Sequence, residues 1–141
     1  MPEFAEAEIH RRNLNHWTQG RVLTQMAVLD PERVEGDAES LSGRRVLRWG
    51  RRAKYLFCSL EGGLHVLVHL GMSGNFAEYS GALPRFCRFA FHFSGDGAEA
   101  TVQVALLDRR RFGRVWVLSD EELQRHPRLL ALGPEPMGPG L

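Results

Sequence analysis

Short apolar segments separated by glycine and polar turns are the feature that most limits the folds open to this chain. Seven stretches combine β-branched or aromatic side chains with partial polar–apolar alternation, a pattern typical of strands. They cover residues 22–29, 44–49, 54–60, 64–70, 88–93, 101–107 and 114–118. Glycines at 62–63 and in the stretch 94–97 predict hairpin turns. Closely spaced strands joined in this way favour an antiparallel sandwich.

Two helices are predicted to flank these strands. The first covers residues 2–17. The second begins at Ser119, which has capping-box spacing with Glu122, and continues to about residue 133 after an interruption at Pro127. The candidate core contacts of the first helix are Ile9, Leu14 and Trp17. The predicted fold class is mainly β with flanking helices: a two-sheet antiparallel β-sandwich with an N-terminal helix.

Length and composition predict one domain with a sizeable core, since 43% of the 141 residues are hydrophobic. No apolar run approaches the ~20 residues of a membrane-spanning helix, and the acidic, proline-containing start is unlike a signal peptide. We therefore expect a soluble cytoplasmic monomer. Cys58 and Cys87 lie in strand-like segments and are interpreted as small core residues of a reducing compartment. The polar, acidic segment 30–42 is expected to be a solvated loop.

The arrangement of the basic residues is more informative than the net charge of +1. One group contains Arg44, Arg45, Arg48, Arg51 and Arg52, and another contains Arg109, Arg110, Arg111 and Arg114. Lys54 is the only lysine among 18 basic residues. A general bias toward arginine explains most of that skew, but the sharper interpretation is a position that needs a compact ammonium instead of a planar fork.

The histidines suggest a metal site only at first sight. His65 and His69 are four residues apart, which on a strand separates them by about 13 Å, too far to share one ion. We therefore predict no metal site. His69 is better interpreted as a support for the turn that follows it, either packed or hydrogen-bonded.

The N-terminus offers an unusual nucleophile. Removal of Met1 before a small residue would leave the secondary amine of Pro2 as the chain terminus. An α-amine has a pKa of about 7.8, so a reactive fraction is present at neutral pH, and attack on a sugar carbon would give an iminium. Glu3 and Glu6 share the helix face beside that amine and could act as acid and base. The same residues are also ordinary at a helix start, where proline and acids are favoured.

Five separated motifs, taken together, favour the catalytic interpretation of the N-terminus over the ordinary helix start. They are MPEFAE at 1–6, RRAKYL at 51–56, HLGMSG at 69–74, DRRRFG at 108–113 and LGPEP at 132–136. In order and approximate spacing they resemble the N-terminal catalytic domain of the formamidopyrimidine-DNA glycosylase and endonuclease VIII family. The resemblance covers essentially the whole chain and implies the same two-sheet fold with an N-terminal helix.

The resemblance implies a DNA repair glycosylase with AP-lyase activity that removes oxidised bases, more often purines, from damaged double-stranded DNA. By that resemblance Pro2 attacks the sugar C1′, Glu3 acts at the ring oxygen or as a proton shuttle, and Glu6 supports positioning. The implied role of Lys54 is a phosphate contact near the lesion.

The other motifs have implied roles in DNA binding. Met72 fills the space left by the extruded base, Phe112 wedges between bases, and Arg110 addresses the partner base. Arg111 belongs to the same basic run and is also predicted to bind DNA, and a solvated turn is the alternative for that run. On an extended segment Arg110 and Phe112 would point the same way. Taken singly, Met72 and Phe112 could each be core residues.

Several departures from the family pattern limit what is carried over. Ala5 and Arg109 each replace a usual proline, and the stretch 84–88 lacks the histidines of many members.

Residues 1–137 are expected to form the catalytic domain and 138–141 the start of a linker. We expect the helix-two-turns-helix module and the zinc finger of the family to lie outside this sequence, so no cofactor is expected in this chain and zinc would belong to the missing part. A separate chain or missing domain would complete the DNA groove. The alternative is a truncated, non-catalytic DNA-binding or protein-interaction module of the same fold.

Overall fold

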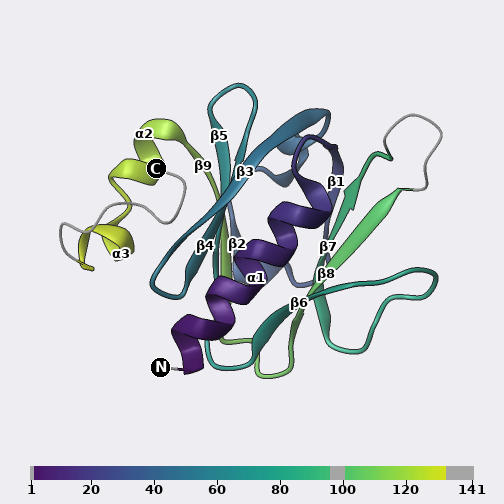
Figure 1. The fold of residues 1–141 in the computed structure, drawn as a ribbon. Helices are drawn as coiled ribbons and strands as arrows, with labels where there is room; N and C mark the ends of the chain where they lie inside the picture. Colours follow the sequence, from purple (N-terminus) through teal and green to yellow (C-terminus); the bar gives the residue numbers. More distant parts are fainter. Residues whose placement is uncertain (1, 96–100, 133–141) are drawn as a thin grey trace.

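The computed structural model describes residues 2–95 and 101–132, with side chains of the first helix from residue 5 onward. One helix precedes the strands and two short helices follow them, and two short 3₁₀ segments lie among the first strands (Figure 1). The helices are α1 (Pro2–Thr18), α2 (Asp120–Gln124) and α3 (Pro127–Leu130), and the 3₁₀ segments are η1 (Pro31–Arg33) and η2 (Ala38–Leu41). The strands are β1 (Val22–Val28), β2 (Val34–Glu35), β3 (Arg44–Arg52), β4 (Tyr55–Leu60), β5 (Leu64–His69), β6 (Gly74–Glu78), β7 (Cys87–Phe93), β8 (Val102–Asp108) and β9 (Arg114–Ser119).

The strands form a sheet that folds over into two facing halves. The strand order is β2-β9-β5-β4-β3-β1-β7-β8-β6. Only two residue pairs, Val22 with Arg45 and Leu23 with Arg44, join β1 to β3, and this short pairing is the corner between the halves. The β2–β9 pair is parallel, and the other pairs are antiparallel. The predicted two-sheet antiparallel sandwich is confirmed, with that one exception.

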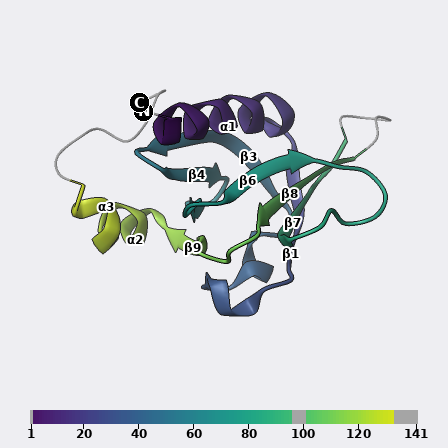
Figure 2. The same cartoon turned by 90° about the horizontal axis from the view of Figure 1, so that it is seen from below.

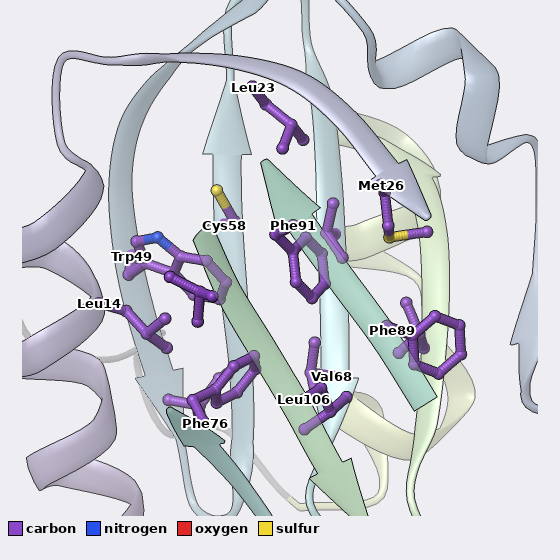
Figure 3. Packing of buried hydrophobic residues seen from close by; sticks show 14 of the residues in the cluster. Leu14, Leu23, Met26, Trp49, Cys58, Val68, Phe76, Phe89, Phe91 and Leu106 are labelled. Atoms are coloured by element: carbon purple, nitrogen blue, oxygen red, sulfur yellow. The ribbon is translucent and has the colours of Figure 1, made fainter. Parts of the chain in front are cut away.

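Both halves contribute to one core of aromatic and aliphatic side chains (Figure 3). Trp49 from β3 packs edge-on against Phe76 from β6, with ring centroids 5.7 Å apart, and Phe76 lies 6.2 Å from Phe91 of β7. Cys58 is buried in the same core, as the sequence predicted. Large buried rings of this kind contribute most of the packing energy of a small domain.

Helix α1 lies across one side of the sandwich, over β3 and beside β6 (Figure 2). The indole N–H of Trp49 donates to the Thr18 hydroxyl at 2.8 Å, and the backbone N–H of Trp49 donates to Asn15 at 2.9 Å. Leu14 is fully buried, as expected. Ile9 is 56% exposed, so its assignment to the core was wrong: the inward face is set by Ala7 and Leu14, which are two helical turns apart.

Segment 30–42 is more ordered than the expected solvated loop. It holds η1, β2 and η2, and buries Leu41 completely. Its first residue, Asp30, is also buried. The polar composition hid these features, because β2 is only two residues long and gains its partner, β9, from a distant part of the chain.

The C-terminal helices follow the predicted boundaries closely. Ser119 and Glu122 form the complete capping box at the start of α2, and Pro127 begins α3 after the interruption. Hairpin glycines Gly62 and Gly63 have positive φ angles, 86° and 75°, as their turn between β4 and β5 requires. The other predicted turn, at 94–97, lies largely outside the described residues, although β7 and β8 pair as a hairpin would.

Two connections at one end of the sandwich cross from one half to the other. Residues 70–73 lead from β5 to β6, and residues 109–113 lead from β8 to β9. In each case the two strands belong to opposite halves, because β5 and β9 pair with each other while β6 pairs with β8. These two crossovers carry the motif residues whose roles the sequence suggested.

Candidate active site and nucleic-acid interface

Three turns and the beginning of α1 come together at one end of the molecule, the lower end in Figure 1. Glu6 from α1, Lys54 from the β3–β4 turn and Met72 from the first crossover line one small hollow of about 60 Å³. The other residues around it are Leu70, Gly71 and Gly74. The structure therefore brings together three of the predicted site residues from segments far apart in the sequence.

Lys54 reaches the Met72 turn directly. Its ammonium donates to the backbone carbonyl of Gly71 at 3.4 Å. Ala53, just before it, has a φ of 53°, which gives the β3–β4 turn its tight reversal. The lone lysine is thus fixed beside the crossover and beside Glu6.

Met72 projects from a turn in which the two glycines, Gly71 and Gly74, have no space beside them for a side chain. It is 75% exposed, so the structure does not support a core role for it. Gly71 has a φ of 64°, and a Cβ placed on it would lie 2.9 Å from the carbonyl carbon of Phe112. Gly74 closes the turn with a 2.8 Å bond from its N–H to the Leu70 carbonyl. The backbone is therefore packed tightly while the methionine side chain stands free of it.

His69 supports this turn as a hydrogen-bond acceptor. The N–H of Gly71 donates to His69 Nδ1 at 3.2 Å, and the imidazole lies 4.6 Å from the ring of Tyr55. Burial, together with the positive charges of Lys54 and Arg128, lowers the pKa of His69 to about 4. The ring is neutral at pH 7, and because Nδ1 accepts, its proton is on Nε2.

Asp108 ties the two crossovers together. Its buried carboxylate accepts from the Ser73 hydroxyl at 2.6 Å and from the Gly113 N–H at 2.7 Å. The N–H of Arg110 in turn donates to Ser73 Oγ at 3.2 Å. The Met72 turn and the arginine turn are consequently one hydrogen-bonded unit. Sequence reasoning did not single out Ser73 or Asp108 for this role, although their place beside the two motifs was the available signal.

The arginine turn differs from the extended segment that the sequence suggested. Arg111 has a φ of 59°, so the residues from Asp108 to Gly113 turn back and do not form the extended segment expected for Arg110 and Phe112. Both of these side chains are nevertheless exposed, Phe112 by 52%. Phe112 is therefore not a core residue at the strand edge.

Arg111 has protein partners. Its guanidinium donates to both carboxylate oxygens of Asp30, at 2.6 and 2.7 Å, and to Glu32 at 2.8 Å. Charge-assisted bidentate pairs of this kind are among the stronger hydrogen bonds in proteins. The prediction that Arg111 contacts DNA therefore has a competing explanation, which is a tether within the protein.

Much of the other arginine group is engaged in the same way. Arg44 donates to the carbonyls of Ser40 and Glu61, and Arg45 donates to that of Gly20. Arg51 pairs with Glu8 at 3.0 Å. Hydrogen bonds from Arg11, Arg51 and Arg12 lower the pKa of Glu8 to about 2, against a smaller opposing effect of burial. This group therefore fixes α1 and the turns to the sheet more than it forms a free basic patch.

The residues of the opening motif are placed only in part. Pro2 and Glu3 belong to the first turn of α1, and their side chains lie outside the described residues. Glu6 is exposed and faces the hollow with Lys54. The motif at 133–136 also lies outside the described residues.

His65, the other histidine considered for a metal site, has two side-chain partners. His65 is hydrogen-bonded to Ser59 at 2.9 Å and to Asp120 at 2.5 Å. Within residues 2–95 and 101–132, no group of three or more His, Cys, Asp or Glu side chains is placed to hold a metal ion.

A wider hollow, of about 430 Å³, lies at the other end of α1, far from these motifs in the fold. Arg21 and Arg45 line it, but both already donate to backbone carbonyls. We therefore regard the smaller hollow, where the motif residues converge, as the candidate site.

Comparison with known families decides the affiliation of the chain. Residues 1–115 match the model of the formamidopyrimidine-DNA glycosylase N-terminal domain. The chain belongs to the formamidopyrimidine-DNA glycosylase family. The motifs at 1–6, 51–56, 69–74 and 108–113 lie within that match. The resemblance inferred from these motifs is confirmed.

Relatives of this glycosylase family cover nearly the whole chain. Formamidopyrimidine-DNA glycosylases of Azorhizobium caulinodans and Brucella ovis are 40% and 38% identical to it, each over 98% of the chain. The same alignments cover 52% and 53% of the relatives. The chain thus spans about half the length of the curated relatives it matches.

Solved structures of the family share the fold. The crystal structure of the MutM (Fpg) protein of Thermus thermophilus matches 95% of this chain and 47% of its own, with a TM-score of 0.79 and 35% identity. A complex of Lactococcus lactis Fpg with DNA containing an oxidised pyrimidine matches 92% and 48%, with a TM-score of 0.77 and 25% identity. In the described part of this chain, no helix is both long and apolar enough to cross a membrane.

Proposed function

We propose that this chain is the catalytic domain of a DNA base-excision glycosylase with AP-lyase activity. Its substrate would be damaged double-stranded DNA carrying oxidised bases, more often purines. The observation that carries the proposal is the convergence of Glu6, Lys54 and the exposed Met72 on one hollow beside the start of α1, in a chain of this family. Residues 1–137 would form this domain and 138–141 a linker.

The proposed chemistry begins with the amine of Pro2, freed by removal of Met1. Its lone pair forms a bond to the deoxyribose C1′, and the bond from C1′ to the damaged base breaks as the base leaves with a proton. Opening of the sugar ring, with Glu3 acting at the ring oxygen or as a proton shuttle, gives an iminium. That electron sink permits loss of the 3′ phosphate by elimination. Glu6 would hold this end of the site in position.

The crossovers would hold the DNA in its distorted state. A base must leave the stack before its sugar carbon can be attacked, which costs a few kcal/mol. Met72 would occupy the vacated space, Phe112 would separate neighbouring bases, and Arg110 would address the unpaired partner base. Their exposure on one hydrogen-bonded unit supports this division of roles.

Lys54 would contact a phosphate near the lesion, since its compact ammonium lies at the edge of the hollow. His69 would act indirectly, by supporting the Met72 turn. For Arg111 the pairing with Asp30 favours a structural role. Zinc, in the family pattern, would belong to a C-terminal finger outside this chain, and action on DNA would place the protein in the bacterial cytoplasm.

The test is covalent trapping of the natural-length protein on abasic DNA with borohydride. Reduction of the iminium should join Pro2 to the sugar, and peptide mapping should locate the adduct there. A variant that keeps Met1 should not be trapped, because Pro2 is then an amide nitrogen. Pro2→Gly retains a terminal amine and should retain part of the trapping. An adduct at Lys54 in the protein with a free Pro2 would refute the assignment.

A further inference from the structure

Segment 30–33 holds the arginine turn from outside the two crossovers. Asp30, 81 residues earlier in the chain, grips the guanidinium of Arg111 with both carboxylate oxygens. Arg33, three residues later, donates to the carbonyl of Gly113 at 3.0 Å. The segment therefore contacts the turn at both its centre and its end.

The carboxylate of Asp30 is buried beside Arg111, unlike the other carboxylate that binds this arginine. Its side chain is only 6% exposed, whereas that of Glu32, which bonds the same guanidinium, is 80% exposed. The Arg111 guanidinium beside Asp30 also lowers the pKa of that carboxyl. A buried carboxylate that is paired in this way stays ionised and costs a great deal to leave unpaired.

The conformation of the turn shows how the ion pair between Asp30 and Arg111 affects the neighbouring residues. Arg111 is one of three non-glycine residues with positive φ in the described chain, and it lies between the exposed Arg110 and Phe112. The central side chain is bonded to Asp30, while Arg110 and Phe112 on either side of it remain exposed. An unheld arginine in a turn facing DNA would instead be free to bind a phosphate.

We propose that Asp30 is a positioning residue for DNA distortion: through Arg111 it fixes the turn that presents Arg110 and Phe112, and it keeps Arg111 away from the phosphates. This inference rests on the proposed glycosylase function. It assigns to segment 30–33, which does not line the hollow, control over how well a paired lesion is opened.

The experiment compares Asp30→Asn with Glu32→Gln in the natural-length protein. Each variant removes one carboxylate charge from the same arginine, so Glu32→Gln is the matched control. For Asp30→Asn we expect single-turnover excision of a paired oxidised purine to fall by about 10- to 100-fold, the range for small misplacement of reacting groups. Cleavage of abasic DNA, which needs no base extrusion, should change less than about twofold, and Glu32→Gln should change neither rate by more.

Salt dependence separates positioning from a general loss of structure. Released from Asp30, Arg111 can reach a phosphate, so the slope of log affinity for undamaged DNA against log salt should steepen by about 0.9. A merely destabilised protein would show a shallower slope or none. Arg111→Lys, which keeps the charge but loses the fork, gives a second variant that should show the same selective loss of paired-lesion excision in weaker form.

Hydrogen exchange tests the grip without any activity. In the unbound protein, amides of residues 109–113 should exchange faster in Asp30→Asn than in Glu32→Gln, with the core strands unchanged. Unchanged exchange, or equal losses of abasic cleavage and paired-lesion excision, would overturn the proposal. If the wild type neither cleaves nor is trapped on abasic DNA, the glycosylase assignment has failed. In that case the inference about DNA distortion falls with it, while exchange still reports whether Asp30 holds the turn.

Discussion

The Ser73 hydroxyl donates a 2.6 Å hydrogen bond to the Asp108 carboxylate, and this bond joins the turn that carries Met72 to the turn that carries Arg110 and Phe112. The two residues are 35 positions apart in the sequence. Three side chains proposed to enter the duplex are thus held on one unit, so a change at the joint should affect them together.

Replacing Asp108 by Asn should loosen that unit. The two carboxylate oxygens of Asp108 accept hydrogen bonds from Ser73 and Gly113, one each. In asparagine one of these oxygens becomes an NH₂ group, which cannot accept, so one of the two donors loses its partner. We expect the free energy of unfolding to fall by about 1–3 kcal/mol, the cost of an unsatisfied buried group. Urea denaturation measures it. Ser73→Ala removes the donor to Asp108 and the acceptor of the Arg110 N–H, which lies at an exposed residue, but it leaves the Gly113 bond in place. It should cost about 1 kcal/mol, and equal costs for both variants would contradict the dual role of Asp108.

Met72→Ala should separate catalysis from base extrusion. Because the side chain is 75% exposed, its removal should change the free energy of unfolding by less than about 0.5 kcal/mol. Excision of a paired lesion should slow by an amount that corresponds to part of the few kcal/mol needed for flipping, while abasic-site cleavage stays near the wild-type rate. Single-turnover assays on the two substrates measure this.

The buried neighbour Leu70 supplies the control for that experiment. Leu70→Ala should cost about 2–5 kcal/mol of stability, since it removes a core side chain on the same turn. If Met72→Ala slows both substrates equally, Met72 has no part in extrusion.

The depressed pKa of His69 gives a pH dependence with a definite sign. The folded-state pKa is about 4, against an ordinary value near 6.5, so the unfolded chain binds more protons between these limits. Stability from His69 is complete above about pH 6.5 and is lost as the pH falls toward 4. One such group changes the free energy of unfolding by at most about 1.4 kcal/mol per pH unit, and His69 by less because it is only partly buried.

Denaturation of His69→Asn at pH 7, 6 and 5 checks this expectation. The asparagine side-chain oxygen can accept the Gly71 N–H but does not titrate, so the variant should lose stability less steeply with falling pH. His10 and His126, whose pKa values are also lowered by burial, should leave a residual slope. Identical slopes for wild type and variant would show that His69 is not the titrating group.

The 141-residue chain alone should fold cooperatively but bind lesion DNA weakly. Arg44, Arg45, Arg51 and Arg111 are engaged within the protein, so these four cations are not free to neutralise phosphates. We expect dissociation constants near the nonspecific range of about 10⁻⁴–10⁻⁶ M and a shallow salt slope. A fluorescence titration at moderate salt measures both, and nanomolar, lesion-selective binding would contradict this account of the groove.

Local sequence patterns were sufficient for most of the fold. Alternating β-branched and aromatic residues located seven strands, and the capping box located α2, because these patterns depend on near neighbours. Strand β6 was missed because Phe76 is its only large apolar residue, and its pairing with β8 defines it. Exposure of Ile9 likewise depends on which helix face the sheet selects.

The site was predictable only as a set of motifs. Order and spacing indicated the residues, including Lys54 and Met72, that the fold brings to one hollow. The partners of those residues could not be predicted, because they come from remote segments. A buried Asp30 has no local pattern, since the arginine that makes its burial tolerable lies 81 residues away.

The crossing of both turns between the halves of the sandwich has a mechanical consequence. A force applied to the tip of a hairpin loop is transmitted to two neighbouring strands of one sheet, and these strands can bend together. Met72, Arg110 and Phe112 stand instead on connections anchored in opposite halves. Force from a stacked duplex on these side chains would arrive as shear between the halves, and the interlocked rings of Trp49, Phe76 and Phe91 resist it. The aromatic core would therefore supply the rigid support that side chains need in order to separate stacked bases.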